Sequence, residues 1–343
     1  MVGEKWGELF DCAWFHFTGK VPLEARGKKC VLLIDISGEG LAYNKEGKIL
    51  QGLTSATSRN EFPLGLWGKR TIEVSDCANG DEEIDIWVDA GCNDLEGQYR
   101  NDGRVKEASI AVVDTLCRDL FYDWVVCQSL YVGLCENNDP YGEEILPIMK
   151  EAAQVLTELT VDNMKKARAL LNKILSRTND KPAMVYTSIG HSHLDLLFLW
   201  PPRETIRKAA RTSSTVLKLM KLYPEYKYVC SQAPIYIWLK KYYPELYEQI
   251  CERIKEGRWE VAGSFFVECD TNIPSGESLV RQILYGKEFF MQEFGLDMRV
   301  GFLPDAFGYS AVLPQLLIKS GTPYFMTQKL SYNDTNRFPR TTF

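Results

Sequence analysis

Two of the three histidines in this sequence lie two residues apart, and an aspartate follows two residues later. His191, His193 and Asp195 form this motif, directly after the apolar segment 183–189, which we predict to be a buried strand. In an extended chain, every second side chain points the same way, about 6.5–7 Å from the last. If the chain bends there, an imidazole and a carboxylate can bind one metal ion through bonds of about 2 Å. A loop with two solvated histidines is the alternative, and the spacing alone leaves both open.

Carboxylates also end the later predicted strands. Glu268 and Asp270 follow one of them, and Asp305 follows the next. Parallel strands place their carboxyl ends at one edge of a sheet, where ligands bind. Asp305 has the alternative of a helix N-cap, and Asp270 that of a turn residue, which we slightly favour. The residues expected to converge on one site are His193, Asp195, Asp270 and Asp305.

The elements that must position these side chains alternate between strands and helices. Such alternation predicts a parallel sheet, so we assign residues 182–343 to an α/β domain with a parallel, barrel-like β/α arrangement. The further predicted strands are 226–230, 259–267, 298–303 and 323–327, and the predicted helices are 203–222, 244–256 and one that begins after the N-cap Ser275.

The first part of the chain has a different pattern. Short apolar or alternating segments separated by turns predict a β-sandwich over residues 1–112, with a hairpin at 41–50. Apolar residues then recur at helical spacing, which predicts a helical connector over 113–181. Within the sandwich we expect His16 to be a packed or half-exposed strand residue. The acidic residues expected there to be solvated or turn-forming are Asp35, Asp85 and Asp89.

Composition excludes several classes of protein. Hydrophobic residues make up 45% and charged residues 25%, as in ordinary globular proteins, and the net charge of −6 argues against a nucleic-acid partner. We expect no secretory signal and no membrane span, because no suitable apolar run is present. None of the ten cysteines forms a CxxC pair, so we expect reduced thiols in a cytoplasmic protein. A homo-oligomer is left open.

Three longer segments resemble those of glycoside hydrolase family 38, the α-mannosidases. They are the histidine motif at 191–195 and the segments 274–282 and 303–310, and the similarity extends to Trp200-Pro201, to Arg203-Glu204-Thr205 and to 328–331. The β region resembles the leading domain of cytosolic and bacterial members. The resemblance implies a retaining exo-α-mannosidase that hydrolyses terminal α-D-mannosides of an oligosaccharide through a covalent glycosyl-enzyme intermediate.

The resemblance also implies the roles of individual residues. His193, Asp195 and Asp305 would hold one divalent ion, and Asp305 would also be the nucleophile. Zinc is the expected ion, although an imidazole and two carboxylates suit cobalt or manganese as well. The open positions of the metal would take the 2- and 3-hydroxyls of mannose. A second carboxyl, about 5–5.5 Å away, would protonate the leaving oxygen.

The sequence departs from the family pattern in two places. Leu196, Leu197 and Phe198 replace the usual Thr-Ala-Trp, and Phe266 stands where a tryptophan is common. Phe198 keeps an aromatic surface and, with Asp270, is a candidate sugar contact. The resemblance implies a fourth metal ligand, a histidine well beyond the third segment. No histidine follows His193 here, so we expect this ligand and the general acid beyond residue 343. The α/β domain is therefore expected to be incomplete, within an N-terminal portion of a longer mannosidase.

Two other functions remain open. An amidohydrolase-like metal hydrolase also begins with His-x-His at a strand end, but it needs later histidines that this chain lacks. A carbohydrate-binding fragment that is catalytically incompetent would keep the fold and lose turnover.

Overall fold

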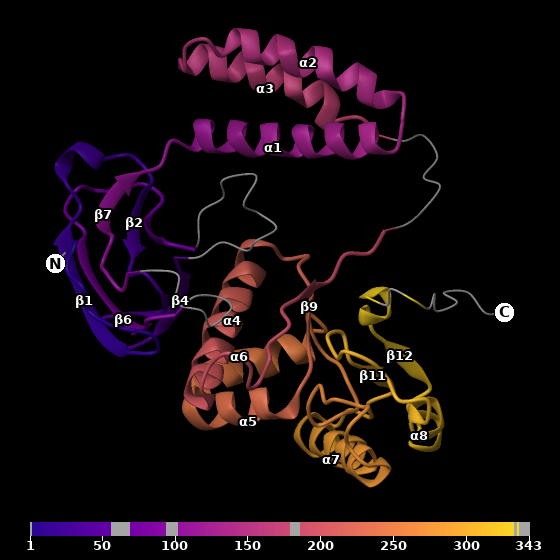
Figure 1. The fold of residues 1–343 in the computed structure, drawn as a ribbon. Coiled ribbons are helices and arrows are strands. Elements are labelled where there is room, and N and C mark those ends of the chain that lie inside the picture. Colours follow the sequence, from indigo (N-terminus) through magenta and orange to yellow (C-terminus); the bar gives the residue numbers. More distant parts are fainter. Residues whose placement is uncertain (1, 56–68, 94–101, 179–185, 333–334, 336–343) are drawn as a thin grey trace.

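The computed structural model describes all of the chain except residues 1, 56–68, 94–101, 179–185, 333–334 and 336–343. Figure 1 shows a β region in indigo and purple at the left, a layer of helices in magenta at the top, and a mixed region that runs from red to yellow below. Among the described helices, none is long and apolar enough to cross a membrane.

The N-terminal region is built from two antiparallel sheets with the strand orders β1-β6-β3-β4 and β5-β2-β7. Their facing side chains form one core, which includes Ile34, Leu53 and Val88. This arrangement confirms the predicted sandwich, and the predicted hairpin is the pair β3 and β4. The strands are β1 (Cys12–Lys20), β2 (Cys30–Asp35), β3 (Glu39–Asn44), β4 (Ile49–Thr54), β5 (Thr71–Ser75), β6 (Glu83–Gly91) and β7 (Glu107–Val112), with a 3-10 turn at Leu23–Ala25.

We expected the acidic residues of the sandwich to be solvated or turn-forming. Solvation was wrong for Asp35 and Asp89, although Asp35 also accepts a hydrogen bond from the backbone N–H of Ser37, as a turn residue does. Asp35 is buried and pairs with Arg70 at 3.1 Å, because a buried carboxylate requires a partner. Asp89 pairs with an arginine of a later helix. Asp85 lies 2.9 Å from His16, which is a half-exposed strand residue as predicted. The arginine partners of Asp35 and Asp89 lie far away in the sequence, so local patterns do not predict these ion pairs.

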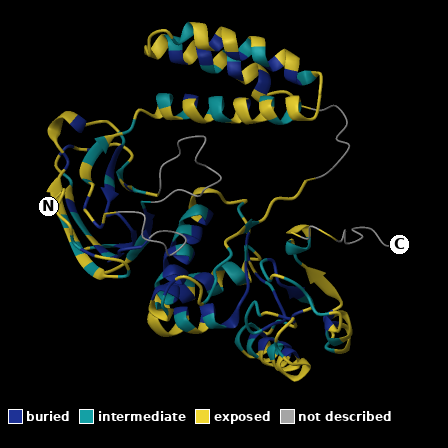
Figure 2. Cartoon of the chain, in the orientation of Figure 1, coloured by how far each residue is buried: buried dark blue, intermediate teal, exposed yellow. Residues whose placement is uncertain are grey.

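Three helices follow: α1 (Thr115–Glu136), α2 (Tyr141–Val155) and α3 (Val161–Leu175). Asp114 and Thr160 cap the first and the third of these helices, accepting hydrogen bonds from Cys117 and Asn163. The apolar stripes that predicted them meet in a separate core that includes Leu120, Ile145 and Leu171. Figure 2 shows dark blue patches among teal and yellow on these helices.

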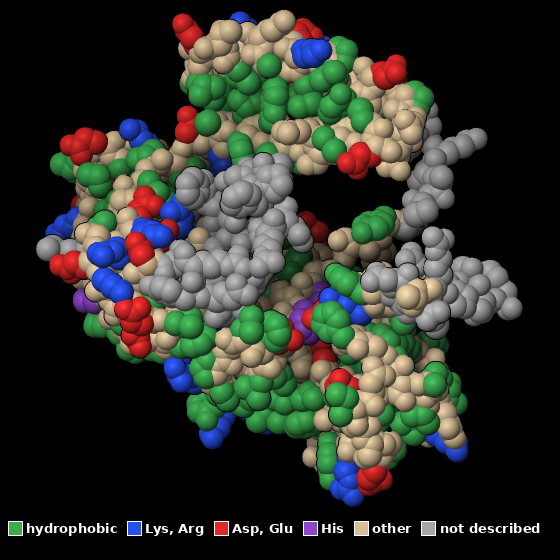
Figure 3. All heavy atoms as spheres, viewed as in Figure 1, with side chains coloured by type: hydrophobic (Ala, Val, Ile, Leu, Met, Phe, Trp, Pro, Cys, Tyr) green, Lys and Arg blue, Asp and Glu red, His purple; other side chains and the backbone are tan. Residues whose placement is uncertain are grey.

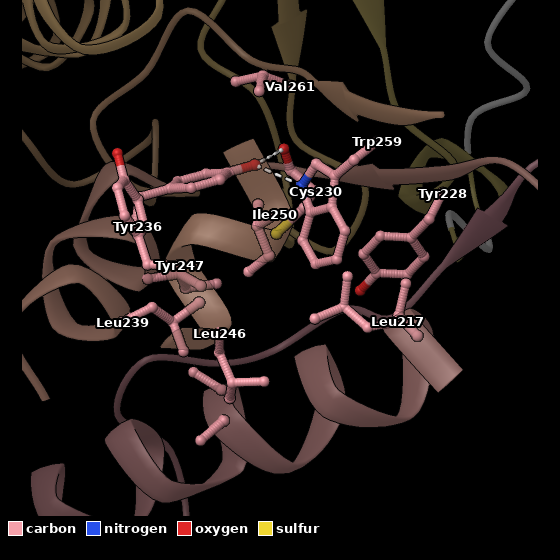
Figure 4. Close-up of a cluster of buried hydrophobic side chains, with 14 of the residues drawn as sticks. Leu217, Tyr228, Cys230, Tyr236, Leu239, Leu246, Tyr247, Ile250, Trp259 and Val261 are labelled. Carbon is pink, nitrogen blue, oxygen red and sulfur yellow. Dashed lines mark hydrogen bonds between the residues drawn. The ribbon is translucent and has the colours of Figure 1, made fainter. Parts of the chain in front are cut away.

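The C-terminal region carries short parallel strands in the orders β10-β9-β8 and β11-β12. One backbone hydrogen bond, from Ser264 to Val300, joins the two sheets at 2.8 Å. The first sheet packs on the hydrophobic core shown in Figure 4, which includes Tyr228, Tyr236 and Trp259. A separate cluster beside the second sheet includes Leu303 and Leu317. The elements are β8 (Gly190–His191), α4 (Pro202–Leu222), β9 (Tyr228–Cys230), α5 (Ala233–Tyr242), α6 (Pro244–Lys255), β10 (Trp259–Val261), α7 (Gly276–Phe294), β11 (Val300–Phe302), α8 (Leu313–Lys319), β12 (Tyr324–Met326) and a 3-10 turn at Lys329–Tyr332.

Parallel pairing and the three predicted helices are confirmed, but the strands are shorter than predicted. The strand predicted at 183–189 was wrong over 186–189, and 183–185 lie outside the described residues. Pairing with β9 covers only Gly190 and His191, so the strand begins there. Helices α5 and α8 were not predicted. In α5, β-branched and aromatic residues weaken the local helix signal, and packing on the core decides the conformation.

Helix α4 also packs against the sandwich. A side chain at Gly52 of β4 would place its Cβ 2.7 Å from the carbonyl oxygen of Arg211, so only glycine permits this approach. Lys208 of α4 binds Glu39 of β3 at 2.7 Å. The sandwich therefore supports the helix that directly follows the histidine motif.

Candidate active site

The histidine motif lies where the chain leaves β8 and bends before α4. The segment from Ser192 to Pro201 has no regular secondary structure. Thr205, in the first turn of α4, donates to the carbonyl oxygen of Leu196 and accepts from Trp200 Nε1. These contacts fix the bend that the sequence argument required for metal binding.

The bend brings the two motif residues to a third residue from a distant strand end. His193 Nε2 lies 3.2 Å from Asp195 Oδ1 and 3.3 Å from Asp305 Oδ2. The three side chains are 25%, 40% and 29% exposed, so the group is partly open to solvent. Figure 3 shows a histidine beside acidic and basic side chains near the middle of one face. Three of the four residues expected to converge are thus together.

These three residues fit a small divalent ion. Their ligand atoms all lie within 4.8 Å of one another. Bonds of about 2.0–2.2 Å in tetrahedral geometry place neighbouring ligand atoms about 3.3–3.5 Å apart, close to the separations found from His193. One nitrogen and two carboxylate oxygens suit zinc, cobalt or manganese.

Asp195 and Glu268 favour a proton on His193 when no metal is bound. Burial of the imidazole lowers its pKa, but hydrogen bonds and charges from Asp195 and Glu268 outweigh that effect and raise the pKa to about 10. A concentration of negative charge of this kind attracts a metal cation as well as a proton.

Two residues that the sequence argument did not select contact the site. Glu268, whose side chain is 5% exposed, places Oε2 2.9 Å from His193 Nδ1. Lys329 Nζ lies 2.6 Å from Asp305 Oδ1, and this hydrogen bond raises the pKa of Lys329. The Lys329 ammonium also lies over the rings of Phe307 and Tyr332, at 4.6 and 4.3 Å from their centroids. The available signal was their position: Glu268 directly follows a predicted strand, and Lys329 lies two residues after another.

The loop that carries Asp305 is tied to the neighbouring loop. Thr271 Oγ1 donates to the carbonyl oxygen of Gly308 at 3.1 Å and accepts from the backbone of Ser310 at 3.2 Å. Gly308 has a φ of +109°, a conformation that favours glycine. This connection holds the two strand ends in register beside His193.

The other candidate residues from the sequence make different contacts. Asp270 accepts hydrogen bonds from the backbone of Asn272 and Ile273, at 2.6 and 3.0 Å, as the turn alternative expected. His191 Nδ1 lies 3.1 Å from the carbonyl oxygen of Val229. Phe198 is 63% exposed and packs edge-on against Trp200.

Two cavities differ in their relation to this site. A cavity of about 280 Å³ is lined by His193, by Glu39 of the sandwich and by Lys208 and Arg211 of α4. A larger cavity of about 520 Å³ lies within the sandwich, among β1, β2 and β7. The larger one contains no group of converging carboxylates, so the chemistry assigns the site to the strand ends around His193.

Comparison with known proteins identifies the class first. Residues 183–343 match the glycosyl hydrolases family 38 N-terminal domain, and residues 1–111 match the jelly roll domain of alpha-mannosidase. The site and the sandwich thus fall in two regions that both occur in one class of glycoside hydrolases. The chain belongs to glycoside hydrolase family 38.

Individual relatives carry the corresponding name. The chain is similar to alpha-mannosidase of Saccharomyces cerevisiae, at 47% identity, and to alpha-mannosidase G of Dictyostelium discoideum, at 35%. Each match covers all of this chain, and the chain spans about a third of the length of these relatives (33% and 32%). An alpha-mannosidase structure from Enterococcus faecalis V583 is 26% identical over 40% of this chain and 16% of that chain, with a TM-score of 0.38.

Proposed function

We propose that this chain carries the metal-binding and nucleophilic residues of a retaining exo-α-mannosidase. One observation carries the proposal: His193, Asp195 and Asp305 bring three ligand atoms within 4.8 Å from two separate strand ends. The relatives named alpha-mannosidase support the substrate class, terminal α-D-mannosides of an oligosaccharide.

In this proposal His193, Asp195 and Asp305 hold one divalent ion, with zinc as the expected metal. When bound, the ion supplies positive charge and open positions for the cis hydroxyls of mannose. Asp305 attacks the anomeric carbon as the glycosidic C–O bond breaks, and the general acid protonates the leaving oxygen, which gives the covalent intermediate. Water then attacks the same carbon, loses its proton to the former general acid, and releases mannose and the Asp305 carboxylate. Lys329 binds Oδ1 of Asp305 and holds the carboxylate with Oδ2 toward His193.

The remaining parts of the function are proposals of the same kind. A general acid and a fourth metal ligand lie beyond residue 343, within a barrel-like domain that begins near residue 182. Residues 1–112 form the sandwich domain and residues 113–181 the helical connector. Phe198 and Asp270 contact the sugar. The ten cysteines are all unbridged, which supports a cytoplasmic location.

Hydrolysis of an aryl α-mannoside tests the proposal, measured on the chain and on the longer protein. We expect Asp305→Asn to reduce kcat by at least about a thousandfold, because a nucleophile cannot be replaced by its amide. The matched control is Asp297→Asn, which removes an exposed carboxylate paired with Lys287 and should leave kcat unchanged.

The second candidate is a carbohydrate-binding fragment without turnover. It is supported by the contacts that the carboxylates near His193 make in the described residues. Those beside His193 belong to Asp195, Glu268 and Asp305, and each is engaged in a contact with the imidazole. Mannose binding by the chain without hydrolysis, together with full activity of the longer protein, would support this candidate.

A further inference from the structure

His193 is held from behind by Glu268. Its Nδ1 lies 2.9 Å from Glu268 Oε2, whereas Nε2 faces the two aspartates. We propose that Glu268 is a positioning residue, which accepts the Nδ1 proton and keeps Nε2 directed at the metal position. This inference rests on the proposed function, because it takes Nε2 as the metal ligand.

Glu268 is itself fixed by its neighbours. Its Oε1 accepts a hydrogen bond from Ser231 Oγ, at the end of β9. Its backbone N–H donates to Gln232 Oε1 at 3.2 Å, and Gln232 Nε2 donates to the carbonyl oxygen of Leu194 at 2.8 Å. One glutamine side chain therefore connects the backbone at Glu268 with the residue that follows His193.

The backbone of Gln232 lies in the left-handed region of φ. Its φ of +68° is unusual for a residue other than glycine and marks a strained backbone conformation. Such a conformation persists where the surrounding contacts hold it, and here the two hydrogen bonds of the side chain do so. Strain at this position supports a functional reason for the placement of Glu268.

Burial explains why Glu268 must pair with the imidazole. A carboxylate that is 5% exposed carries a large desolvation cost unless it meets a partner. Among the described residues its ion pair is with His193. Glu268 Oε2 and His193 Nδ1 lie 2.9 Å apart, outside hydrogen-bond geometry, and neither of these buried atoms has another hydrogen-bond partner. Metal-binding histidines commonly donate their second N–H to a carboxylate, whose loss weakens metal affinity about 10–100-fold.

A direct role of Glu268 in metal binding is the competing possibility. Ligand atoms of His191, His193 and Glu268 also lie within 4.8 Å of one another. In that arrangement the ion would bind Nδ1 of His193, and the two aspartates, which face Nε2, would not be ligands. The two possibilities therefore differ in which nitrogen of His193 binds the ion.

The histidine content makes this difference measurable. With three histidines in the chain, the imidazole nitrogen signals of ¹⁵N-labelled protein can be assigned by single substitutions. In wild type we expect a slowly exchanging Nδ1 proton on His193, both without metal and after addition of Zn²⁺, and the zinc shift at Nε2. Glu268→Ala should remove the protection of that proton.

Zinc affinity provides the second readout. Glu268→Gln, which keeps the shape and an acceptor oxygen, should weaken zinc binding about 10–100-fold with Nε2 still the ligand. Ser231→Ala should weaken zinc binding less, because this change removes only the hydrogen bond to Glu268 Oε1 and retains the buried carboxylate. The matched control is Glu260→Gln, an exposed glutamate on β10, which should leave both readouts unchanged.

Three results would overturn the inference: a protected Nδ1 proton that survives in Glu268→Ala, zinc affinity unchanged in Glu268→Gln, or the zinc shift at Nδ1. A wild-type protein that binds no zinc would instead overturn the proposed metal site. The Nδ1 proton of the metal-free protein would still report whether Glu268 holds the imidazole, so the two failures are distinguishable.

Discussion

Two groups of charged side chains lie on either side of the start of α4, and their partners give them different roles. At the contact with the sandwich, Glu204 is fully buried and binds Arg207 and Arg211. At the strand ends, His193 is partly exposed and is approached by three carboxylates. The first group places permanent cations against each anion. The second places a surplus of anions around one titratable group.

The difference lies in what each group can still bind. In the first group Lys208 and Arg211 also reach Glu39, and Arg207 reaches Asp89, so positive and negative charges balance within the fold. In the second group, acceptors of Asp195 and Asp305 point at one position, which leaves room for an added cation. Balanced burial indicates structure, and unbalanced convergence indicates a site.

The largest expected effect comes from breaking the balanced group. Glu204→Ala leaves Arg207 and Arg211 without their shared buried anion, so we expect the free energy of unfolding to fall by about 3–5 kcal/mol. Urea unfolding measures this change. Glu277→Ala, which removes an exposed carboxylate from the pair with Arg281, should have little effect. Equal losses in the two variants would contradict the structural role of the buried group.

Substitution of His193 and of the neighbouring His191 can show which of the two histidines binds the metal. His193→Ala should reduce zinc affinity by at least about a hundredfold, because it removes the sole nitrogen ligand. His191→Ala should change it little, since His191 is turned toward the carbonyl oxygen of Val229. Competition with a zinc chelator measures both. A comparable loss in His191→Ala would assign the site to the group of His191, His193 and Glu268.

At acidic pH, the change of stability with pH should come from the balanced group. Burial raises the pKa of Glu204, but the charges of Arg211 and Arg207 outweigh that effect, so the folded-state pKa lies below the ordinary value of 4.5. The stabilisation is therefore complete above pH 4.5 and is lost as the pH falls through the lowered pKa. Unfolding midpoints of wild type and Glu204→Gln should differ by a constant amount above pH 5 and converge below 4.5. Convergence above pH 5 would contradict this assignment.

The smallest effect is expected at the edge of the site. Phe198 is 63% exposed, so Phe198→Leu should leave stability unchanged. If its ring stacks on the sugar, KM for the aryl α-mannoside should rise several-fold, from the loss of about 1 kcal/mol of aromatic contact. Steady-state kinetics measures this, with Phe307→Leu for comparison because that ring instead lies against Lys329. No change in KM would assign Phe198 to packing against Trp200 alone.

Local sequence patterns were sufficient for much of the fold. Alternation predicted the sandwich, and helical spacing predicted α4, α6 and α7, because each element buries one face whose period is written in its own residues. The short β8 and helix α5 were not predicted, since pairing with β9 and packing on the core of Tyr236 and Trp259 decide them. The same limit explains Asp35, whose partner Arg70 follows a long stretch of intervening chain.

By itself the sequence determined the residue types at the strand ends, and with them the histidine motif, the carboxylate of Asp305 and the family resemblance. Only the tertiary structure decided which of these residues meet. It joined His193 and Asp195 to Asp305, left Asp270 in a turn, and added Glu268 and Lys329 from other strand ends. The physical reason is that side-chain chemistry belongs to each residue, whereas distances between strand ends depend on how the whole sheet pairs and bends.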